Sequence, residues 1–507
     1  MRGPARERSI ACTCRRVALL LPRRGGDRRP DCDRHQHDHQ DCDDCTPHQV
    51  CCAAIPPSTI YRPSTTKGVT PQSNPPQAPC RPLDRGNSDE AISDIRIILR
   101  GNMQTVIKNA NYFDTTNLSF AGDSTIVIED GIILSVGETA IGSADAVIDA
   151  ANQFVLPGLI DAHVHFRLAT LNFRRLAELS EVEFGIMMAR LATETVHRGF
   201  TTVRDLCGEV DSLMRAIRTG LVVGPRIVRA GLSITQTGGH GDAESGRRPV
   251  PQWACSMRHN SFGIVADGVE AVRKAARHVL REGSDFIKIH VSGGVASPND
   301  PLEAIQYTPE EITTVVREAQ NRHTYVAAHA YSPASIAMAV ENGVHSIEHG
   351  NLIDAKAAAA LVDHGAVLVP TLVTYFGMRE AGAKFGLPAT NALKNQKVLE
   401  AGLASLEIAK SAGVSIGFGT DLIGELQNLQ NREFAIRSEV QSAHEILHAM
   451  YVVNPKLCRL EGKVGVIKSG AFADLVISKA NPLDDIKVLA DPRINFSAII
   501  KGGVRIL

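Results

Sequence analysis

Six side chains with the chemistry of metal ligands are spread over the middle and C-terminal parts of this 507-residue sequence. They are His163, His165, Lys288, His329, His349 and Asp421. Imidazole and carboxylate groups suit zinc and neighbouring divalent ions. His163 and His165 are two positions apart, so both project to the same side of an extended segment and one ion can take both nitrogens. These residues predict a metal centre.

Lys288 is the most informative of the six. It lies in the apolar run Phe286–Ile289, on a predicted strand that is buried on both faces. Burial without a partner lowers the pKa of an ammonium group and favours the neutral amine. A neutral amine can add carbon dioxide, and the carbamate that forms can bridge two cations. The alternative is an ion pair with an acid such as Asp421, but four histidines at neighbouring strand ends favour the bridge.

The elements that must position these residues alternate between short apolar runs and helical stretches from Gln153 onward, which is typical of parallel βα units. Eight strands are predicted, at residues 154–160, 201–204, 226–230, 285–290, 324–328, 346–348, 366–369 and 414–418. This pattern predicts an α/β fold, a (β/α)8 TIM barrel, in which the carboxyl ends of the strands converge on one mouth. The candidate ligands lie on or just after five of these strands.

Segments on both sides of the barrel predict a second, smaller domain. Short strands are expected at residues 105–110, 124–129 and 131–136, with a hairpin turn at Asp130-Gly131, and again at 465–467, 473–478 and 498–506. We expect these strands to pair into a β-sandwich. The predicted boundaries are 96–156 and 453–507 for the two parts of the sandwich and 157–452 for the barrel.

Residues 1–95 differ from the rest of the chain, because they hold eight of the eleven cysteines and show neither strand nor helix periodicity. We expect a disordered tail rich in Arg, Cys and Pro. A zinc site on the irregular His/Cys run from His35 to Cys52 is the alternative. The apolar run Val17–Leu21 is too short for a signal peptide, and a transit peptide stays open. Few cysteines beyond Ala91 fit a reducing compartment, so we expect a cytoplasmic protein.

Composition excludes several classes of partner. Lys and Arg number 54 against 55 Asp and Glu, so the net charge of −1 argues against a polybasic nucleic-acid binder. Aromatic residues make up 5%, which argues against a base-stacking platform, and no apolar run is long enough to span a bilayer. We expect a small-molecule substrate, no nucleic acid and no membrane. A homo-oligomer is left open, because no interface pattern is visible.

Short motifs resemble those of the amidohydrolase superfamily, binuclear type. They are LPGLIDAHVH at 156–165, TTVRD at 201–205 and GTD at 419–421. The resemblance covers roughly residues 95–507. The motifs TGGHGD at 237–242 and SGGVASP at 292–298, together with Lys288, are most similar to the branch that holds ochratoxinase and Xaa-Pro dipeptidases.

The resemblance implies a two-metal centre, most simply zinc. One ion would lie on His163, His165 and Asp421 and the second on His329 and His349. Carboxylated Lys288 would bridge them. A hydroxide held between the ions would attack the carbonyl of an amide or peptide bond, and Asp421 would act as general base and then general acid. The expected substrates are dipeptides of the Xaa-Pro type or N-acyl amino acids such as ochratoxin-like amides.

Three further residues are candidate substrate contacts. His240 and Tyr331 can donate hydrogen bonds to an oxyanion or to a terminal carboxylate. His290 departs from the resemblance, because related sequences usually carry an apolar residue there; it contacts substrate or hydrogen-bonds within the core. Two other functions are kept as alternatives. One is a mononuclear deaminase or imidazolonepropionase-like cyclic amide hydrolase, which has no use for a bridging carbamate, and the other is a non-catalytic binding protein.

Overall fold

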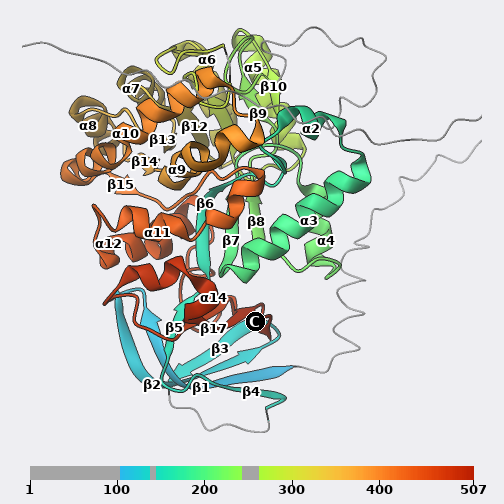
Figure 1. Cartoon of the computed structure of the whole chain (residues 1–507), viewed down its shortest axis with the longest axis vertical. Coiled ribbons are helices and arrows are strands. Elements are labelled where there is room, and N and C mark those ends of the chain that lie inside the picture. The colour runs from blue at the N-terminus through green and yellow to red at the C-terminus, as the bar shows by residue number, and fades with distance from the viewer. Residues whose placement is uncertain (1–102, 138–143, 243–261, 298) are drawn as a thin grey trace, which may run out of the picture. The chain divides into compact units, whose positions relative to one another are not determined.

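The computed structural model describes residues 103–137, 144–242, 262–297 and 299–507, all within one unit of the chain, residues 85–507 (Figure 1). The predicted disordered tail and the His/Cys run from His35 to Cys52 lie outside the described residues. Within the described ranges, each helix is too short or too polar to cross a lipid bilayer.

Parallel strands form the part of the fold that carries the candidate ligands. One sheet has the order β6 (Leu159–Val164), β7 (Phe200–Asp205) and β8 (Arg226–Arg229). A seven-stranded sheet has the order β10 (Gly263–Val265), β9 (Ser233–Thr235), β11 (Ile287–His290), β12 (Val326–Ala330), β13 (Ser346–His349), β14 (Val367–Val369) and β15 (Ser415–Ile416). Parallel pairing between strands separated by helices confirms the predicted α/β class.

Backbone hydrogen bonds also join the two parallel sheets at two places. The amide of Ala162 on β6 donates to the carbonyl of Phe418, just beyond β15, at 2.8 Å. The amide of Asp285, just before β11, donates to the carbonyl of Arg229 at the end of β8, at 2.9 Å. Backbone hydrogen bonding therefore runs from one parallel sheet to the other through the segments that flank their strands.

Helices follow the strands in sequence, and Figure 1 shows α7 and α8 beside the seven-stranded sheet. The longer helices are α3 (Glu181–His197), α4 (Asp211–Arg218), α5 (Val269–Arg281), α6 (Pro309–Gln320), α7 (Pro333–Glu341), α8 (Ala355–Asp363), α9 (Leu372–Ala381) and α10 (Ala389–Ala412). The shorter ones are α2 (Phe173–Glu178), α11 (Arg432–Arg437), α12 (Ala443–His448), α13 (Asn454–Leu457) and α14 (Pro492–Asn495). Ser332 caps α7 before Pro333, and Gly413 ends α10 in the left-handed conformation.

A separate mixed sheet lies beside the parallel strands. Its path is β18 (Val504–Arg505), β17 (Phe496–Lys501), β16 (Leu475–Ser478), β5 (Phe154–Pro157), β1 (Gln104–Asp114), β2 (Ser119–Glu129) and β3 (Ile132–Gly137), with β4 (Ala146–Asp149) paired to β1. The predicted Asp130-Gly131 hairpin joins β2 to β3, and both residues have positive φ, 49° and 79°. Antiparallel pairing of β16 with β5 brings segments from both sides of the parallel strands into one sheet.

Some predicted strands differ from those observed. The single strand predicted at 154–160 is two strands, β5 in the mixed sheet and β6 in the parallel one. Gly158 separates them, and a Cβ there would lie 2.0 Å from Oγ1 of Thr201, so only glycine lets the chain pass. The strand predicted at 465–467 is wrong, because Gly465 turns the backbone with φ 69°. Strands β9 and β10 are too short to show a periodic pattern.

Candidate metal centre and active site

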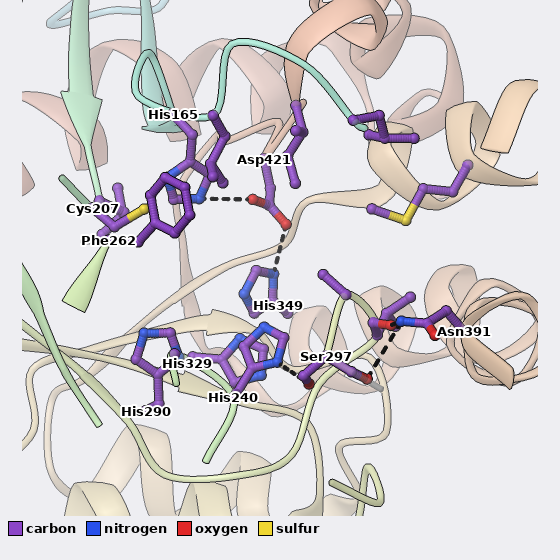
Figure 2. Close-up of a pocket in the computed structure, with 18 of the residues that line it drawn as sticks. His165, Cys207, His240, Phe262, His290, Ser297, His329, His349, Asn391 and Asp421 are labelled. Atoms are coloured by element: carbon purple, nitrogen blue, oxygen red, sulfur yellow. Dashed lines mark hydrogen bonds and ion pairs between the residues drawn. The ribbon is translucent and has the colours of Figure 1, made fainter. Parts of the chain in front are cut away.

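A cavity of about 390 Å³ lies at the carboxyl ends of the parallel strands (Figure 2). All six predicted ligands line it, and so do the three predicted substrate contacts, His240, His290 and Tyr331. Apolar side chains complete much of the wall; they include Leu168, Leu171, Leu206, Met378 and Leu387. A largely apolar pocket with a few convergent polar groups is typical of a small-molecule site.

The structure brings His163, His165 and Asp421 together, with ligand atoms within 4.8 Å of one another. Nε2 of His163 lies 3.2 Å from Nε2 of His165. Oδ1 of Asp421 lies 3.4 Å from the first of these nitrogens and 3.0 Å from the second. Ligands of a tetrahedral zinc ion, bound at about 2.0–2.1 Å, are about 3.3 Å apart. The donor set and its spacing therefore fit one zinc-sized ion.

Neighbouring side chains fix the orientation of both imidazoles. Nδ1 of His163 lies 2.7 Å from Oε2 of Glu348, and Nδ1 of His165 lies 3.2 Å from Sγ of Cys207. Because a carboxylate only accepts hydrogen bonds, the Glu348 contact places the proton of His163 on Nδ1 and leaves the Nε2 lone pair toward Asp421. Arg204 donates to Oε1 of Glu348 at 2.6 Å, and both of these side chains are fully buried.

Electrostatics keep the carboxylates of Asp421 and Glu348 ionised. Burial acts to raise the pKa of Asp421, but His163, His165 and His349 outweigh it and hold the pKa well below the usual value. Burial likewise opposes ionisation of Glu348, but Arg204 and His163 lower its pKa. Asp421 also has a left-handed backbone, with φ 52°, as does His349, with φ 74°. Such conformations cost about 1–3 kcal/mol in non-glycine residues and cluster at functional sites.

The other three predicted ligands lie on neighbouring strands. The rings of His329 and His349 have centroids 4.6 Å apart. Nε2 of His329 lies 3.1 Å from the carbonyl of Gly293, and Nδ1 of His349 lies 2.9 Å from Oγ1 of Thr371, so each ring keeps one nitrogen for another partner. Lys288 is 3% exposed, and burial lowers its pKa to about 8, although Glu348 and Asp421 act in the opposite direction.

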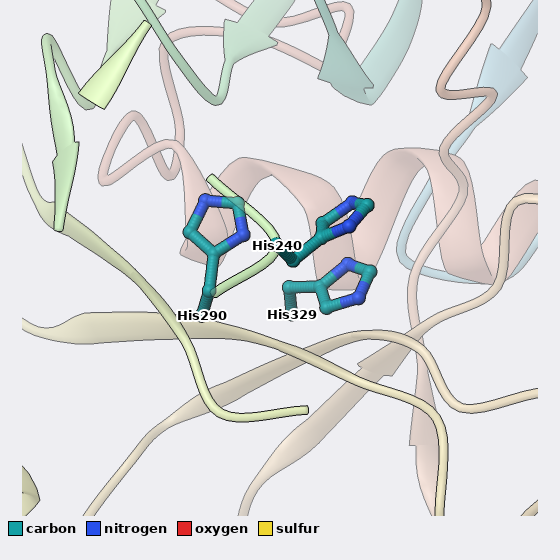
Figure 3. Close-up of side chains that lie close together, drawn as sticks. All are labelled: His240, His290 and His329. Carbon is teal, nitrogen blue, oxygen red and sulfur yellow. The ribbon is translucent and has the colours of Figure 1, made fainter. Parts of the chain in front are cut away.

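A second imidazole group, which sequence reasoning did not treat as a unit, consists of His240, His290 and His329 (Figure 3). Their nearest ligand nitrogens lie within 4.8 Å of one another. The rings of His240 and His329 are stacked, however, with centroids 4.2 Å apart and planes 18° from parallel. The in-plane lone pairs of stacked rings run side by side and do not converge, so this arrangement favours ring stacking over joint binding of one ion.

The predicted substrate contacts all face the cavity, each in a different setting. His290 and Lys288 are two positions apart on β11 and both face the cavity, and both ring nitrogens of His290 are buried with no hydrogen-bond partner among the described residues. The hydroxyl of Tyr331 lies 2.7 Å from that of Tyr375, and its ring stacks on His349. His240 contacts Ser297 through Nδ1, at 2.6 Å.

Sequence reasoning missed the residues that hold these groups in place. They are Glu348, Cys207, Thr371, Tyr375 and Ser297. Glu348 carries a recognisable signal, since a carboxylate inside a buried strand next to a candidate ligand needs a cationic or hydrogen-bonded partner. The other four are common residue types in loops or helices, and only the folded arrangement relates them to the site.

The sequence profile of the Amidohydrolase family matches residues 154–505, which is more than half of the chain. This chain belongs to the amidohydrolase family. An ochratoxinase from Aspergillus niger is 29% identical over 396 residues, covering 75% of this chain and 82% of the relative. The sequence resemblance to this superfamily and to its ochratoxinase and Xaa-Pro dipeptidase branch is confirmed.

Solved structures agree with this assignment. A crystal structure described as an amidohydrolase aligns with TM-score 0.76 and 42% identity over 80% of this chain and 99% of that chain. A prolidase in complex with N-methylphosphonate-L-proline aligns with TM-score 0.76 and 40% identity over the same shares. This chain is a hydrolase of carbon–nitrogen bonds, with a fold of the TIM-barrel type and a flanking domain.

Proposed function

We propose that this amidohydrolase cleaves the amide bond of dipeptides, of the Xaa-Pro type, or of N-acyl amino acids. The observation that carries the proposal is the convergence of His163, His165 and Asp421 in a cavity with largely apolar walls. The similarity to a prolidase and to an ochratoxinase supports a substrate in which the leaving amine belongs to an amino acid.

His163, His165 and Asp421 would hold one divalent ion, and His329 and His349 a second, with carboxylated Lys288 between them. When bound, a pair of such ions, which we expect to be zinc, lowers the pKa of a water molecule and polarises the scissile carbonyl. In a deaminase that binds a single ion, Lys288 would have no second ion to bridge and would not serve as a ligand. This is why we favour the two-metal hydrolase over a mononuclear enzyme.

Asp421 is the residue that we expect to move the proton. Its Oδ1 faces His163 and His165, whereas its Oδ2 lies 3.7 Å from Nδ1 of His349. Oδ2 would accept a proton from the attacking water and then deliver it to the leaving nitrogen, because an amide nitrogen leaves only after protonation. A low pKa favours the carboxylate form that the first of these two steps requires.

His240, His290 and Tyr331 would bind the substrate. His240 would contact the reacting amide group of the substrate from the wall of the cavity. The buried ring nitrogens of His290 have no hydrogen-bond partner in the part of the chain that the structure describes, and the free carboxylate of the substrate would supply one. Tyr331 would act together with Tyr375, whose hydroxyl it contacts.

We also propose the finer architecture that would hold this site: a closed (β/α)8 barrel over residues 157–452, with a β-sandwich made from residues 96–156 and 453–507. The backbone hydrogen bonds that join β6 to the segment after β15, and β8 to the segment before β11, support closure of the barrel. A separate apolar cluster that joins Ile107, Ile126 and Ile133 with Leu475 and Ile500 supports a sandwich core.

A hydrolysis panel tests this function. The full-length protein is stripped of metal, reconstituted with zinc, and assayed on Xaa-Pro dipeptides, N-acyl amino acids, an imidazolone and adenosine-type amines. Release of an amino acid from the first two classes supports the proposal, and proline release distinguishes the dipeptidase type from the ochratoxinase type. Ring opening or ammonia release without amide cleavage would instead favour the mononuclear alternative.

A further inference from the structure

The glycine-rich loop after β11 packs against His240 and holds its ring in place. Oγ of Ser297 lies 2.6 Å from Nδ1 of His240 and also donates a short hydrogen bond to Oδ1 of Asp300. Ser297 and Asp300 are 7% and 5% exposed. The three side chains form a continuous chain from a buried carboxylate through a hydroxyl to the imidazole.

The proton positions in this chain follow from its acceptors. The Ser297 hydroxyl has two acceptors within reach, and the carboxylate of Asp300 is much nearer than the carbonyl of Gly294 at 3.3 Å, so the single hydroxyl proton is directed to Asp300. The serine oxygen must then accept from His240, which places a proton on Nδ1. Nε2 therefore keeps a lone pair, and Oδ2 of Asp300 lies 3.7 Å from Nδ1.

A second contact fixes the backbone of the same histidine. Oε1 of Gln306 accepts from the amide of His240 at 3.1 Å, while its Nε2 donates to Oδ2 of Asp300 at 3.2 Å. The amide of Gly294 also donates to Oδ2, at 3.1 Å. Asp300 is thus connected to His240 twice, to its side chain through Ser297 and to its backbone through Gln306.

The loop itself is fastened to α10. Nζ of Lys394 donates to the carbonyls of Gly294 and Ser297 at 3.0 and 2.9 Å and to that of Asp300 at 2.5 Å. Asn391 donates to the carbonyl of Val295 at 2.6 Å. Gly294 packs directly against the ring: a Cβ there would lie 2.1 Å from Cε1 and 2.2 Å from Nδ1 of His240. Any side chain at position 294 would therefore displace the ring of His240.

We propose that Asp300 and Ser297 form a hydrogen-bond relay that holds the proton of His240 on Nδ1 and directs the lone pair of Nε2 into the cavity, where it accepts a hydrogen bond from the leaving nitrogen as Asp421 protonates that nitrogen. Ser297 and Asp300 are positioning residues that act through His240. The inference rests on the proposed amide hydrolysis only for its kinetic readout, since the proton position of His240 is measurable without any substrate. The SGGVASP motif at 292–298 would then position His240, because it supplies Gly294 and Ser297.

A double-mutant cycle tests the relay in the zinc-reconstituted full chain. Ser297→Ala should lower kcat about 10- to 100-fold with KM changed less than about threefold, as expected when a group that contacts the reacting atoms loses its orientation. In a His240→Ala background, Ser297→Ala should lower kcat no further, because its effect passes through the missing ring. Ser297→Thr, which keeps the hydroxyl, should recover most of the activity.

Lys397→Ala is the matched control, because it removes an exposed ion pair between α10 and Glu303 outside the relay and should leave kcat unchanged. ¹⁵N spectra of histidine-labelled protein give the independent readout. We expect Nδ1-protonated His240 in the wild type and loss of that single tautomer in Ser297→Ala. Equal kcat losses from Ser297→Ala in both backgrounds, or an Nε2-protonated neutral ring in the wild type, would overturn the relay. A folded protein that cleaves no amide would refute the proposed function and leave the spectroscopic test intact.

Discussion

At the scale of single residues, the site depends on where protons and lone pairs are placed. Glu348 leaves His163 with a lone pair on Nε2, and Gly293 does the same for Nδ1 of His329 by accepting from the opposite nitrogen. These contacts turn buried neutral imidazoles into oriented donors of electron pairs. Metal-binding histidines are commonly held in this way by an acceptor on the far nitrogen.

Asp421→Asn tests the proton-transfer role. An amide can still offer an oxygen to the first ion but cannot accept and return a proton, so kcat should fall about 10²- to 10⁴-fold while much of the metal is retained. Steady-state kinetics and elemental analysis of the same preparation measure both quantities. Near-normal turnover in this variant would remove Asp421 from proton transfer.

Glu348→Gln tests the orientation of His163. The new amide group would point an N–H at Nδ1 of His163, so the ring must move its proton to Nε2 and lose the lone pair toward the metal. We expect metal affinity to fall about 10- to 100-fold, measured by competition with a chromophoric chelator. Glu341→Gln, at the exposed end of α7, is the control and should bind metal normally. Unchanged affinity in Glu348→Gln would contradict this role.

The sequence showed the candidate ligands because their residue types are rare in buried strands. It did not show Ser297, Cys207 or Tyr375, since each is far in sequence from the residue that it contacts and has an ordinary composition around it. Ser297 and His240, for example, are 57 positions apart and meet only when the loops after two different strands pack together.

At the scale of elements, local signals explain most of the helices and the failures are confined to short strands. Capping boxes begin α3, α6 and α12, and positive-φ glycines follow α7 and α10. The apolar run 154–160 gave no sign that it changes sheet at Gly158. Its pattern is continuous, and the break depends on the close approach of Thr201 from β7.

Glu311 provides a prediction at this scale, because one carboxylate serves the first turns of two helices. Its Oε2 accepts from the amide of Thr308 at 2.8 Å, and its Oε1 accepts from that of Gly268, ahead of α5, at 2.6 Å. Glu311→Ala should lower the free energy of unfolding by about 1–2 kcal/mol, measured by urea denaturation. Glu310→Ala, in the same first turn, should change it by less than about 0.5 kcal/mol. Equal effects of the two variants would contradict the shared cap.

At the scale of the whole molecule, residues 103–507 combine a parallel α/β unit with a mixed sheet that collects strands from both ends of that unit. The alternation of strands and helices made the α/β class predictable. The pairing of β16 with β5 was suggested only by the strands on either side of the unit, because no local pattern encodes a contact across more than 300 positions.

Metal removal tests how far the folded state depends on the site. An ion that binds only the folded chain adds about 2.7 kcal/mol when its free concentration is a hundred times Kd. The chelated protein should therefore melt at a lower temperature than the zinc-reconstituted one. Mg²⁺, which prefers oxygen ligands, should not restore the higher Tm. Identical melting curves with and without zinc would show that these residues hold no ion in the folded chain.

The central claim is that a buried lysine joins two cations held by four histidines and Asp421. Elemental analysis of the zinc-reconstituted wild type and of Lys288→Ala, each after exhaustive dialysis, tests it most directly. The account predicts two zinc ions per wild-type chain and at most one in the variant, with loss of activity. Two ions retained in Lys288→Ala would contradict it.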